Sequence, residues 1–322
     1  RSRIARTLFG LQFGAVGTIE IKGAEVSVST PTDAMDLGIA LVPEDRRRQG
    51  LVLDHSVEDN IALPVLGSVS GKVMVHGARR AKLADDTIAK MSIKTDSRKA
   101  PANSLSGGNQ QKIVLAREIE RNPDLLLVGQ PTRGVDIGAI EFIPQQIVAL
   151  RDQGKAILLV SVELEEILSL SDRIAVMSAG KILQVGSPRD IYERPAERFV
   201  ANFIGESNFL DAELAGNTVT LRAGGQFDAR VPDGVADGPV SVLVRPEHAQ
   251  VRAGTAGEGE IGAVIETVVY SGDATSVHMR LGTGELVKAR MPNAPGDGSD
   301  LPGEGGAVIM TIAPGAITVL KD

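Results

Sequence analysis

The sequence predicts an α/β domain followed by an all-β domain. Up to about residue 186, short apolar runs that suit buried strands alternate with apolar patterns of helical period. Beyond Leu210, strands with apolar residues at every second position are separated by turns rich in Gly, Pro and Asp. The chain has 322 residues, of which 43% are hydrophobic, so it can form about two cores.

The elements of the first part follow from their apolar spacing. The strand candidates are Ile39 to Val42, Asp124 to Val128, Ala156 to Ser161 and Arg173 to Met177. Gly17 to Val28 is typical of a hairpin, and Ala78 to Met91 is typical of a helix. A further helix is expected from Gly138 to Asp152, but an interior proline, Pro144, costs about 3 kcal/mol. We expect a kink or a break at that proline.

The most informative stretch places a hydroxyl and two glycines before an amphipathic helix. Ser106, Gly107 and Gly108 lie in the run LSGGNQ, and apolar residues at helical spacing follow from Ile113 to Ile119. A helix N-terminus has free N–H groups and a positive dipole end, and glycine lets a phosphate approach the backbone closely. Two further side chains of the run offer neutral donors, Asn109 and Gln110. The alternative is a Ser/Gly helix start that binds nothing.

The order of the motifs after this run matches a known family. The helix closes at Pro123, an apolar run follows, and the polar turn GQPTRGVD ends at Asp136. In this order the motifs resemble the signature, Walker B and D-loop of ATP-binding cassette (ABC) transporter ATPases. Residues 1–180 resemble the second cassette of the fused double ATPases that serve ribose, galactose, simple-sugar and nucleoside importers. The resemblance implies a P-loop NTPase-like ABC cassette that uses ATP and Mg²⁺ and pairs with a second cassette.

The resemblance assigns the first residues to the tail of a degenerate P-loop. Arg1 stands at the position of the usual lysine, and Ser2 stands at that of the magnesium-binding hydroxyl. The glycines that would precede them are absent from this sequence, so we expect an N-terminally truncated cassette that binds ATP poorly by itself. An ordinary helix start at a frayed terminus explains Arg1 and Ser2 equally well.

Several other family positions carry different residues. Glu44 stands at the Q-loop glutamine, although its run EDRRR is otherwise a solvated charged turn. Gly129 and Gln130 replace the Walker B aspartate and glutamate, and Val162 replaces the switch histidine. Phosphoryl transfer needs a neutralising metal and a placed nucleophile, so we expect no intact catalytic residue in cis.

The resemblance implies that the residues with which a cassette contacts the nucleotide of its partner cassette are retained. Asp136 matches the D-loop aspartate, and it also suits the N-cap of a helix that begins near Ile137. ABC cassettes sandwich ATP head to tail, so the resemblance implies that this signature run acts in trans on the nucleotide of another cassette. The resemblance also makes Ser2 a metal ligand. It assigns the following positions to nucleotide binding: Arg1, Ser2, Glu44, Ser106, Gly107, Gly108, Asn109, Gln110 and Asp136.

The second part resembles a different ABC branch. Residues 186–322, through VRPEH and VVYSG, are similar to the TOBE regulatory domain of polyamine-, iron- and maltose-type importer ATPases. Alternating apolar residues in 240–244 and 277–281 predict strands of a small OB-like barrel. The expected domains are a cassette at 1–205 and an all-β, OB-like TOBE domain at 206–322. This TOBE-like domain either senses a ligand or only enlarges a dimer interface.

Composition narrows the function classes. There is no cysteine, which excludes disulfides and thiolate metal sites, and the four histidines are too scattered for a zinc site. The net charge of −7 argues against a nucleic-acid surface. No apolar run approaches the roughly 18 residues of a membrane span, and no signal-peptide pattern opens the sequence. Any membrane association should therefore come through a partner protein. The resemblance implies that the partners are transmembrane permease subunits and that the chain lies peripherally at the cytoplasmic face of the inner membrane.

Together these features predict the ATP-binding subunit of a bacterial ABC importer for a sugar or a nucleoside, with a degenerate site in cis. One alternative is a non-hydrolysing regulatory or dimerisation module, or a polyamine- or iron-type importer ATPase. Another is a non-functional chimeric fragment that is joined near residues 178–186. The lost carboxylates leave open whether any ATP hydrolysis remains.

Overall fold

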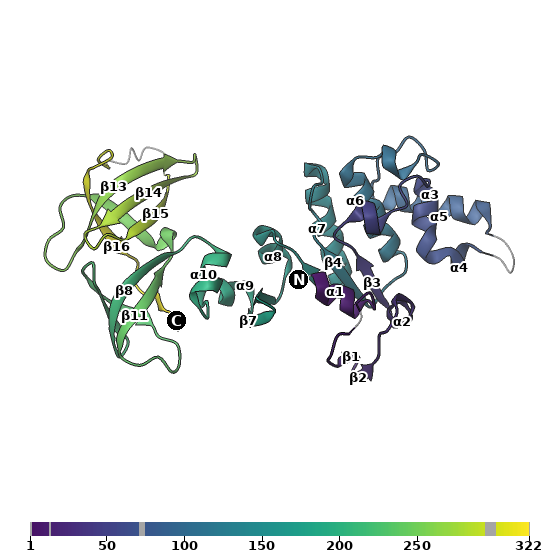
Figure 1. Cartoon of the computed structure of the whole chain (residues 1–322). Helices are drawn as coiled ribbons and strands as arrows, with labels where there is room; N and C mark the ends of the chain where they lie inside the picture. Colours follow the sequence, from purple (N-terminus) through teal and green to yellow (C-terminus); the bar gives the residue numbers. More distant parts are fainter. Residues whose placement is uncertain (1, 13, 71–74, 294–300, 322) are drawn as a thin grey trace. The chain divides into compact units, whose positions relative to one another are not determined.

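The chain divides into two compact units in the computed structural model, which describes residues 2–12, 14–70, 75–293 and 301–321 (Figure 1). The first unit is Arg1–Ser171 and the second is Asp172–Asp322. Helices and strands mix in the first unit, and strands dominate the second, as the sequence predicts. The domain boundary expected near residue 205 remains a prediction, because compactness alone does not delimit a family domain.

Helices and short strands alternate along the first unit. Its elements are α1 (Ser2–Leu8), β1 (Ile19–Ile21), β2 (Ala24–Val26), α2 (Pro31–Asp36), β3 (Ile39–Val42), the π-helical turn η1 (Arg46–Gly50), α3 (Val57–Ala62), η2 (Leu63–Val65), α4 (Leu66–Val69), α5 (Gly77–Lys90), η3 (Ala102–Ser104), α6 (Gly107–Ile119), β4 (Leu125–Gly129), α7 (Ile137–Asp152), β5 (Ala156–Val160) and α8 (Leu164–Leu170). The expected hairpin is the antiparallel pair β1–β2, and the helix expected from Ala78 is α5.

A parallel sheet in the order β3-β4-β5 lies at the centre of the first unit. Val42 is paired with Val128, and Val128 is paired with Leu159. Side chains alternate between the two faces, as strand geometry requires. The face with Val42 and Val128 packs on α3, α6 and α7, and the face with Ile39 and Leu127 packs on α1 and α2. The carboxyl ends of β3 and β4 therefore lie side by side, and the candidate site begins there.

Helix α7 continues through Pro144, so of the kink or break expected there a break is absent, and the kink stays a prediction. Ile143 and Ile147 are buried in the core between the helix and the sheet. Burial of one such side chain stabilises by about 1.5–3 kcal/mol, which offsets the cost of roughly 3 kcal/mol for an interior proline. The carbonyl that loses its donor belongs to Ile140, an exposed residue. Tertiary packing thus overrides a local preference.

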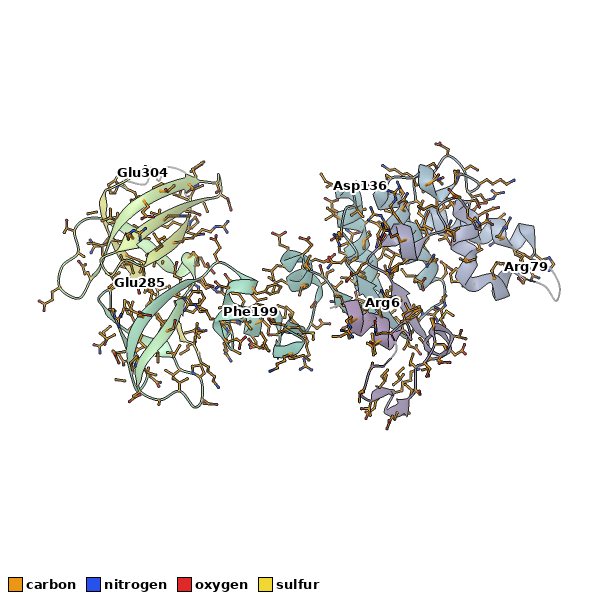
Figure 2. The ribbon with its side chains drawn as sticks, in the orientation of Figure 1. Arg6, Arg79, Asp136, Phe199, Glu285 and Glu304 are labelled. Atoms are coloured by element: carbon orange, nitrogen blue, oxygen red, sulfur yellow. The ribbon has the colours of Figure 1, made fainter. Side chains whose placement is uncertain are left out.

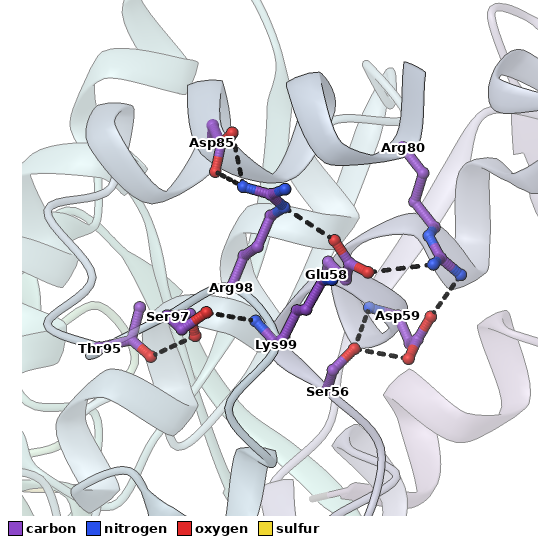
Figure 3. Close-up of polar contacts among 9 residues, drawn as sticks. All are labelled: Ser56, Glu58, Asp59, Arg80, Asp85, Thr95, Ser97, Arg98 and Lys99. Atoms are coloured by element: carbon purple, nitrogen blue, oxygen red, sulfur yellow. Dashed lines mark hydrogen bonds and ion pairs between the residues drawn. The ribbon is translucent and has the colours of Figure 1, made fainter. Parts of the chain in front are cut away.

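A charged network fixes the helices between β3 and α6 (Figure 3). Glu58 of α3 is 5% exposed and accepts hydrogen bonds from Arg80 of α5 and from Arg98, both at 3.0 Å. Arg80 also pairs with Asp59 at 2.7 Å, and Arg98 pairs with Asp85 at 3.2 Å. A buried carboxylate without partners is costly, so these pairs hold α3, α5 and the segment that leads to α6 as one block.

The second unit is built mainly from antiparallel strands. Its elements are β6 (Ile174–Ser178), β7 (Lys181–Gly186), α9 (Pro188–Glu193), α10 (Arg198–Ile204), β8 (Asn208–Ala215), β9 (Thr218–Leu221), β10 (Gln226–Arg230), β11 (Gly238–Val244), η4 (Pro246–His248), β12 (Ala249–Ala253), β13 (Ile261–Tyr270), β14 (Ala274–Leu281), β15 (Leu286–Pro292), β16 (Ala307–Ile312) and β17 (Ile317–Val319). The strands form a closed barrel, β10-β17-β11-β8-β9, and a sheet, β12-β16-β13-β14-β15, which share one apolar core. The predicted β-rich second part is confirmed.

Strand β6 differs from the sequence-based expectation. It pairs with β7 in a separate antiparallel hairpin, whereas the sequence suggested a strand of the α/β sheet. Ala179 and Gly180, between the two strands, have φ values of 47° and 80°. Positive φ at both central residues suits a tight hairpin turn, and this turn returns the chain alongside β6.

Candidate functional site

The signature run forms an exposed turn at the start of α6. Ser106 is the N-cap, and its Oγ accepts hydrogen bonds from the backbone N–H of Asn109 at 3.4 Å and from Asn109 Nδ2 at 3.0 Å. Ser106 is exposed, whereas Gly108 is buried. The first N–H groups of a helix have no acceptor within the helix. The turn therefore presents the Ser106 hydroxyl group at the surface of the first unit.

Two amide side chains support the turn from within. Gln110 is 3% exposed, and its Nε2 donates to the carbonyls of Ala102 and Leu105, both at 3.1 Å. Asn109 Oδ1 accepts a hydrogen bond from the N–H of Lys94 at 2.8 Å. The amide donors that the sequence suggested for a ligand are therefore used inside the protein, where they fix the shape of the loop.

Asp136 joins the turn to the D-loop. Figure 2 labels Asp136 in the first unit. It is the N-cap of α7, where Oδ1 accepts from the N–H of Ala139 at 3.0 Å. Its Oδ2 accepts a hydrogen bond from Ser106 Oγ at 3.3 Å. The N-cap interpretation of Asp136 is confirmed, and the same carboxylate also contacts the signature serine.

The two glycines of the turn are required by packing. A Cβ on Gly107 would lie 2.9 Å from the carbonyl oxygen of Gly134. A Cβ on Gly108 would lie 2.9 Å from Ala139 Cβ and would also meet the carboxylate of Asp136. Any larger residue would push the signature turn away from the D-loop.

Two cations that the sequence did not single out also hold this region. Arg46 donates from Nη1 to the carbonyl of Arg133 and from Nη2 to that of Gly134, both at 2.8 Å. Burial, and then the charge of a neighbouring arginine, lower the pKa of Arg46. Lys112 donates to the carbonyl of Ser92 at 3.0 Å and lies 4.3 Å from the ring centroid of Phe142. Such contacts join distant segments, so no local pattern reveals them.

The end of β4 lacks the carboxylates that the family uses. A Cβ on Gly129 would lie 2.7 Å from Cγ of Glu44, so Glu44 already fills the space of an aspartate. Gln130 follows in a left-handed conformation, with φ of 49°, and is 8% exposed. Its Oε1 has no hydrogen-bond partner within the described part of the chain. Neither position supplies a charge for a metal ion or for an attacking water.

The segment after β5 does not replace those groups. Val162, at the switch position, is 51% exposed. The neighbouring Ser161 is buried, and its Oγ accepts a hydrogen bond from the N–H of Glu163 at 3.0 Å. A pocket of about 550 Å³ opens nearby and is lined by Glu44, Gly129 and Val160 among others. Its position at the carboxyl ends of parallel strands is typical of ligand sites in α/β proteins.

The end of β4 offers no carboxylate for a magnesium ion. Arg1 and the side chain of Ser2 lie outside the described residues. Across the described ranges, no group of three or more His, Asp or Glu side chains is placed to hold a metal ion. Gly129 offers no ligand, and Glu44 fills the adjacent space. The Ser106 turn, in contrast, has the donor chemistry that a phosphate group needs.

The described part of the chain also contains no helix that combines the length and the apolar character needed to span a membrane.

Family models match both parts of the chain. Residues 1–133 match the model described as ABC transporter, and residues 242–320 match the model of the TOBE domain. A solved dimer of the ATP-binding cassette MJ0796, in a post-hydrolysis state bound to ADP and Pi, aligns with a TM-score of 0.49 and 21% identity. The alignment covers 58% of this chain and 80% of that chain.

Curated relatives resemble the chain over different lengths. The spermidine/putrescine import ATP-binding protein PotA of Mesorhizobium japonicum is 34% identical, over 100% of this chain and 86% of its own length. The guanosine import ATP-binding protein NupO of Bacillus subtilis is 41% identical over 60% of this chain, and the ribose import ATP-binding protein RbsA of Shouchella clausii is 40% identical over 60%. The chain spans 38% and 39% of these last two proteins. On the full-length match to PotA and the two family models, this chain belongs to the family of ATP-binding proteins of ABC transporters.

Proposed function

We propose that this chain is the ATP-binding subunit of a bacterial importer and that it completes, in trans, the nucleotide site of a second cassette. The observation that carries the proposal is the exposed Ser106 turn, which Asp136 contacts at the surface and Gln110 braces from within. On the other side of the cassette, Gly129 and Gln130 stand where catalytic carboxylates are needed. The chain thus retains the half that acts on a partner.

The chemistry of the turn is electrostatic. Ser106 Oγ–H and the first N–H groups of α6 donate to the oxygens of a terminal phosphate on the partner's nucleotide. In the structure Ser106 Oγ donates to Asp136 Oδ2, so binding a phosphate turns that hydroxyl proton away from the carboxylate. Asp136 keeps its hydrogen bond to the N–H of Ala139, and α7 stays capped.

The partner cassette supplies the P-loop, the magnesium ligands and the base. ATP binding draws the two cassettes together, and transmembrane permease subunits couple this motion to transport at the cytoplasmic face of the inner membrane. Similarity of the cassette to proteins named for guanosine and ribose import supports a nucleoside or a sugar as cargo. Uptake of labelled ribose, guanosine and spermidine, with and without the gene, tests this choice. Loss of spermidine uptake alone would refute it and would favour the polyamine class.

The decisive experiment measures ATP turnover by a complex of this chain with a cassette that carries an intact P-loop and a Walker B glutamate. Ser106→Arg fills the phosphate-binding turn, and we expect it to lower turnover by about 100-fold, as does loss of an oxyanion donor in other enzymes. Ser104→Arg places the same side chain at an exposed position two residues earlier and should leave turnover nearly unchanged.

Unchanged turnover in the Ser106→Arg complex would refute action in trans. If that complex also assembled without nucleotide, the chain would be a dimerisation module. The purified chain alone should show no turnover and only weak binding of ATP, since it lacks carboxylates at the end of β4.

A further inference from the structure

One side chain joins the segment after β3 to the D-loop. Arg46 begins the turn η1, whose N-cap Asp45 accepts hydrogen bonds from the N–H groups of Arg47 and Arg48, each at 3.1 Å. From this turn the guanidinium of Arg46 reaches two consecutive D-loop carbonyls, at 2.8 Å each. A planar guanidinium donates in this forked way, whereas a lysine ammonium has no matching geometry.

The same guanidinium borders the signature turn. A Cβ on Gly107 would lie 2.6 Å from Arg46 Nη2, and only the absence of a side chain there leaves room for it. The Nε of Arg46 is buried without a hydrogen-bond partner among the described residues. Burying an unpaired donor costs free energy, so Nε does not hold the guanidinium in this place. Its position is set by the two hydrogen bonds to the carbonyls.

We propose that Arg46 is a positioning residue that couples the segment from Glu44 to Gly50 to the Ser106 turn through the D-loop. Arg46 holds the carbonyl of Gly134, and that carbonyl packs against Gly107. Two residues later, Asp136 accepts the hydrogen bond of Ser106. Displacement of the segment after β3 therefore displaces the D-loop and changes the geometry that the turn offers to a phosphate.

This inference rests on the proposed function, because it concerns control of the same turn. The segment from Glu44 to Gly50 lies at the rim of the pocket of about 550 Å³, which Glu44, Asp45 and Gln49 help to line. A ligand or protein segment that enters this pocket and moves η1 would act on the Ser106 turn through Arg46, without contacting the turn itself.

The first test uses the purified chain alone and does not depend on ATP. Hydrogen exchange is measured in peptides that cover 105–110 and 130–140, for the wild type, Arg46→Lys, Arg46→Ala and Arg47→Lys. Both Arg46 variants should exchange about 10-fold faster at Arg133 and Ala139, since two hydrogen bonds to the D-loop are lost. Arg47→Lys, an exposed neighbour on the same turn, should stay within about twofold of the wild type. Wild-type protection in Arg46→Lys would overturn the inference, even if Arg46→Ala failed to fold.

The second test measures kinetics in the complex with a competent cassette. Arg46→Lys should lower kcat about 10-fold and leave the KM for ATP within about twofold, because the nucleotide cradle belongs to the partner. A merely structural defect would lower the fraction of active complex, which active-site titration reports separately. Wild-type kcat in Arg46→Lys, together with loss of turnover in Ser106→Arg, would refute the role of Arg46 and leave the proposed function standing. If the complex with Ser106→Arg kept full turnover, the proposed function would be refuted. The hydrogen-exchange data would still show whether Arg46 holds the D-loop.

Discussion

The signature turn and the end of β4 differ in how their glutamine side chains are held. On the signature side, Ser106, Asp136 and Gln110 all have hydrogen-bond partners, and the bond from Ser106 to Asp136 joins two distant segments. At the end of β4, the Oε1 of Gln130 is buried without a partner in the described chain, and Gly129 carries no side chain at all. The difference shows that two parts of one unit can hold the same type of side chain in different ways.

The two regions also depend on different kinds of interaction. The signature turn is held by its contacts with the D-loop, in which the N–H of Arg133 donates to the carbonyl of Gln130 after β4. The Walker B side depends on charges that only carboxylates supply. Variants on the two sides should therefore behave differently.

The largest effect is expected from restoring a carboxylate at the end of β4. Gly129→Asp forces a Cβ to within 2.7 Å of Glu44 Cγ and places two acids together. We expect a loss of about 2–3 kcal/mol in the free energy of unfolding, measured by urea denaturation. Adding Glu44→Ala should recover at least half of that loss. A fully stable Gly129→Asp variant would show that the space is not occupied as described.

A matched pair of glutamine substitutions tests the comparison directly. Gln110→Met removes two hydrogen bonds to buried loop carbonyls and should cost about 1–2 kcal/mol. Gln130→Met removes an acceptor that has no partner, so its free energy of unfolding should be unchanged or higher. Equal destabilisation by both changes would contradict the difference between the two sides.

The N-caps of α7 and α8 are expected to differ by a smaller amount in the free energy of unfolding. Asp136→Ala removes a side-chain cap from α7 and should lower the free energy of unfolding by about 1 kcal/mol, with Asp136→Asn close to the wild type. Glu163 is the N-cap of α8 but makes no side-chain cap bond, so Glu163→Ala should have almost no effect. Thermal denaturation of the three variants measures the difference. A cost at Glu163 as large as that at Asp136 would count against the contrast.

The smallest effect concerns pH. Lys112 is 9% exposed, and burial lowers its pKa from the usual 10.5, so the folded chain binds fewer protons at this site than the unfolded chain just below pH 10.5. Below the lowered pKa, the folded chain bears the full cost of burying the charged ammonium group. This cost disappears as the pH rises to 10.5, because the buried amine loses its proton. Relative to Lys112→Met, the wild type should therefore gain stability across that alkaline window. If the free energy of unfolding changed with pH in the same way for the wild type and Lys112→Met, Lys112 would not be desolvated.

The fold class and the order of the motifs could be predicted from the sequence. The strand at Ile39 to Val42 and the helix from Ala78 lie where apolar spacing placed them, because period and length are local properties. The failure at Pro144 has the opposite cause, since burial of Ile143 and Ile147 is a property of the assembled core. Strand β6 was found at nearly the expected residues but in another sheet, because strand pairing is not a local property.

The candidate site divides in the same way. The sequence by itself determined the residue types: a serine and two glycines before one helix, an aspartate before the next, and Gly129 and Gln130 at the end of an apolar run. Only the tertiary structure decided how these residues are held. Arg46 reaches carbonyls 87 and 88 residues away, and Gln110 turns its amide inward to the loop. Residue types fix which bonds a side chain can make, but contacts between distant segments exist only once the chain has packed.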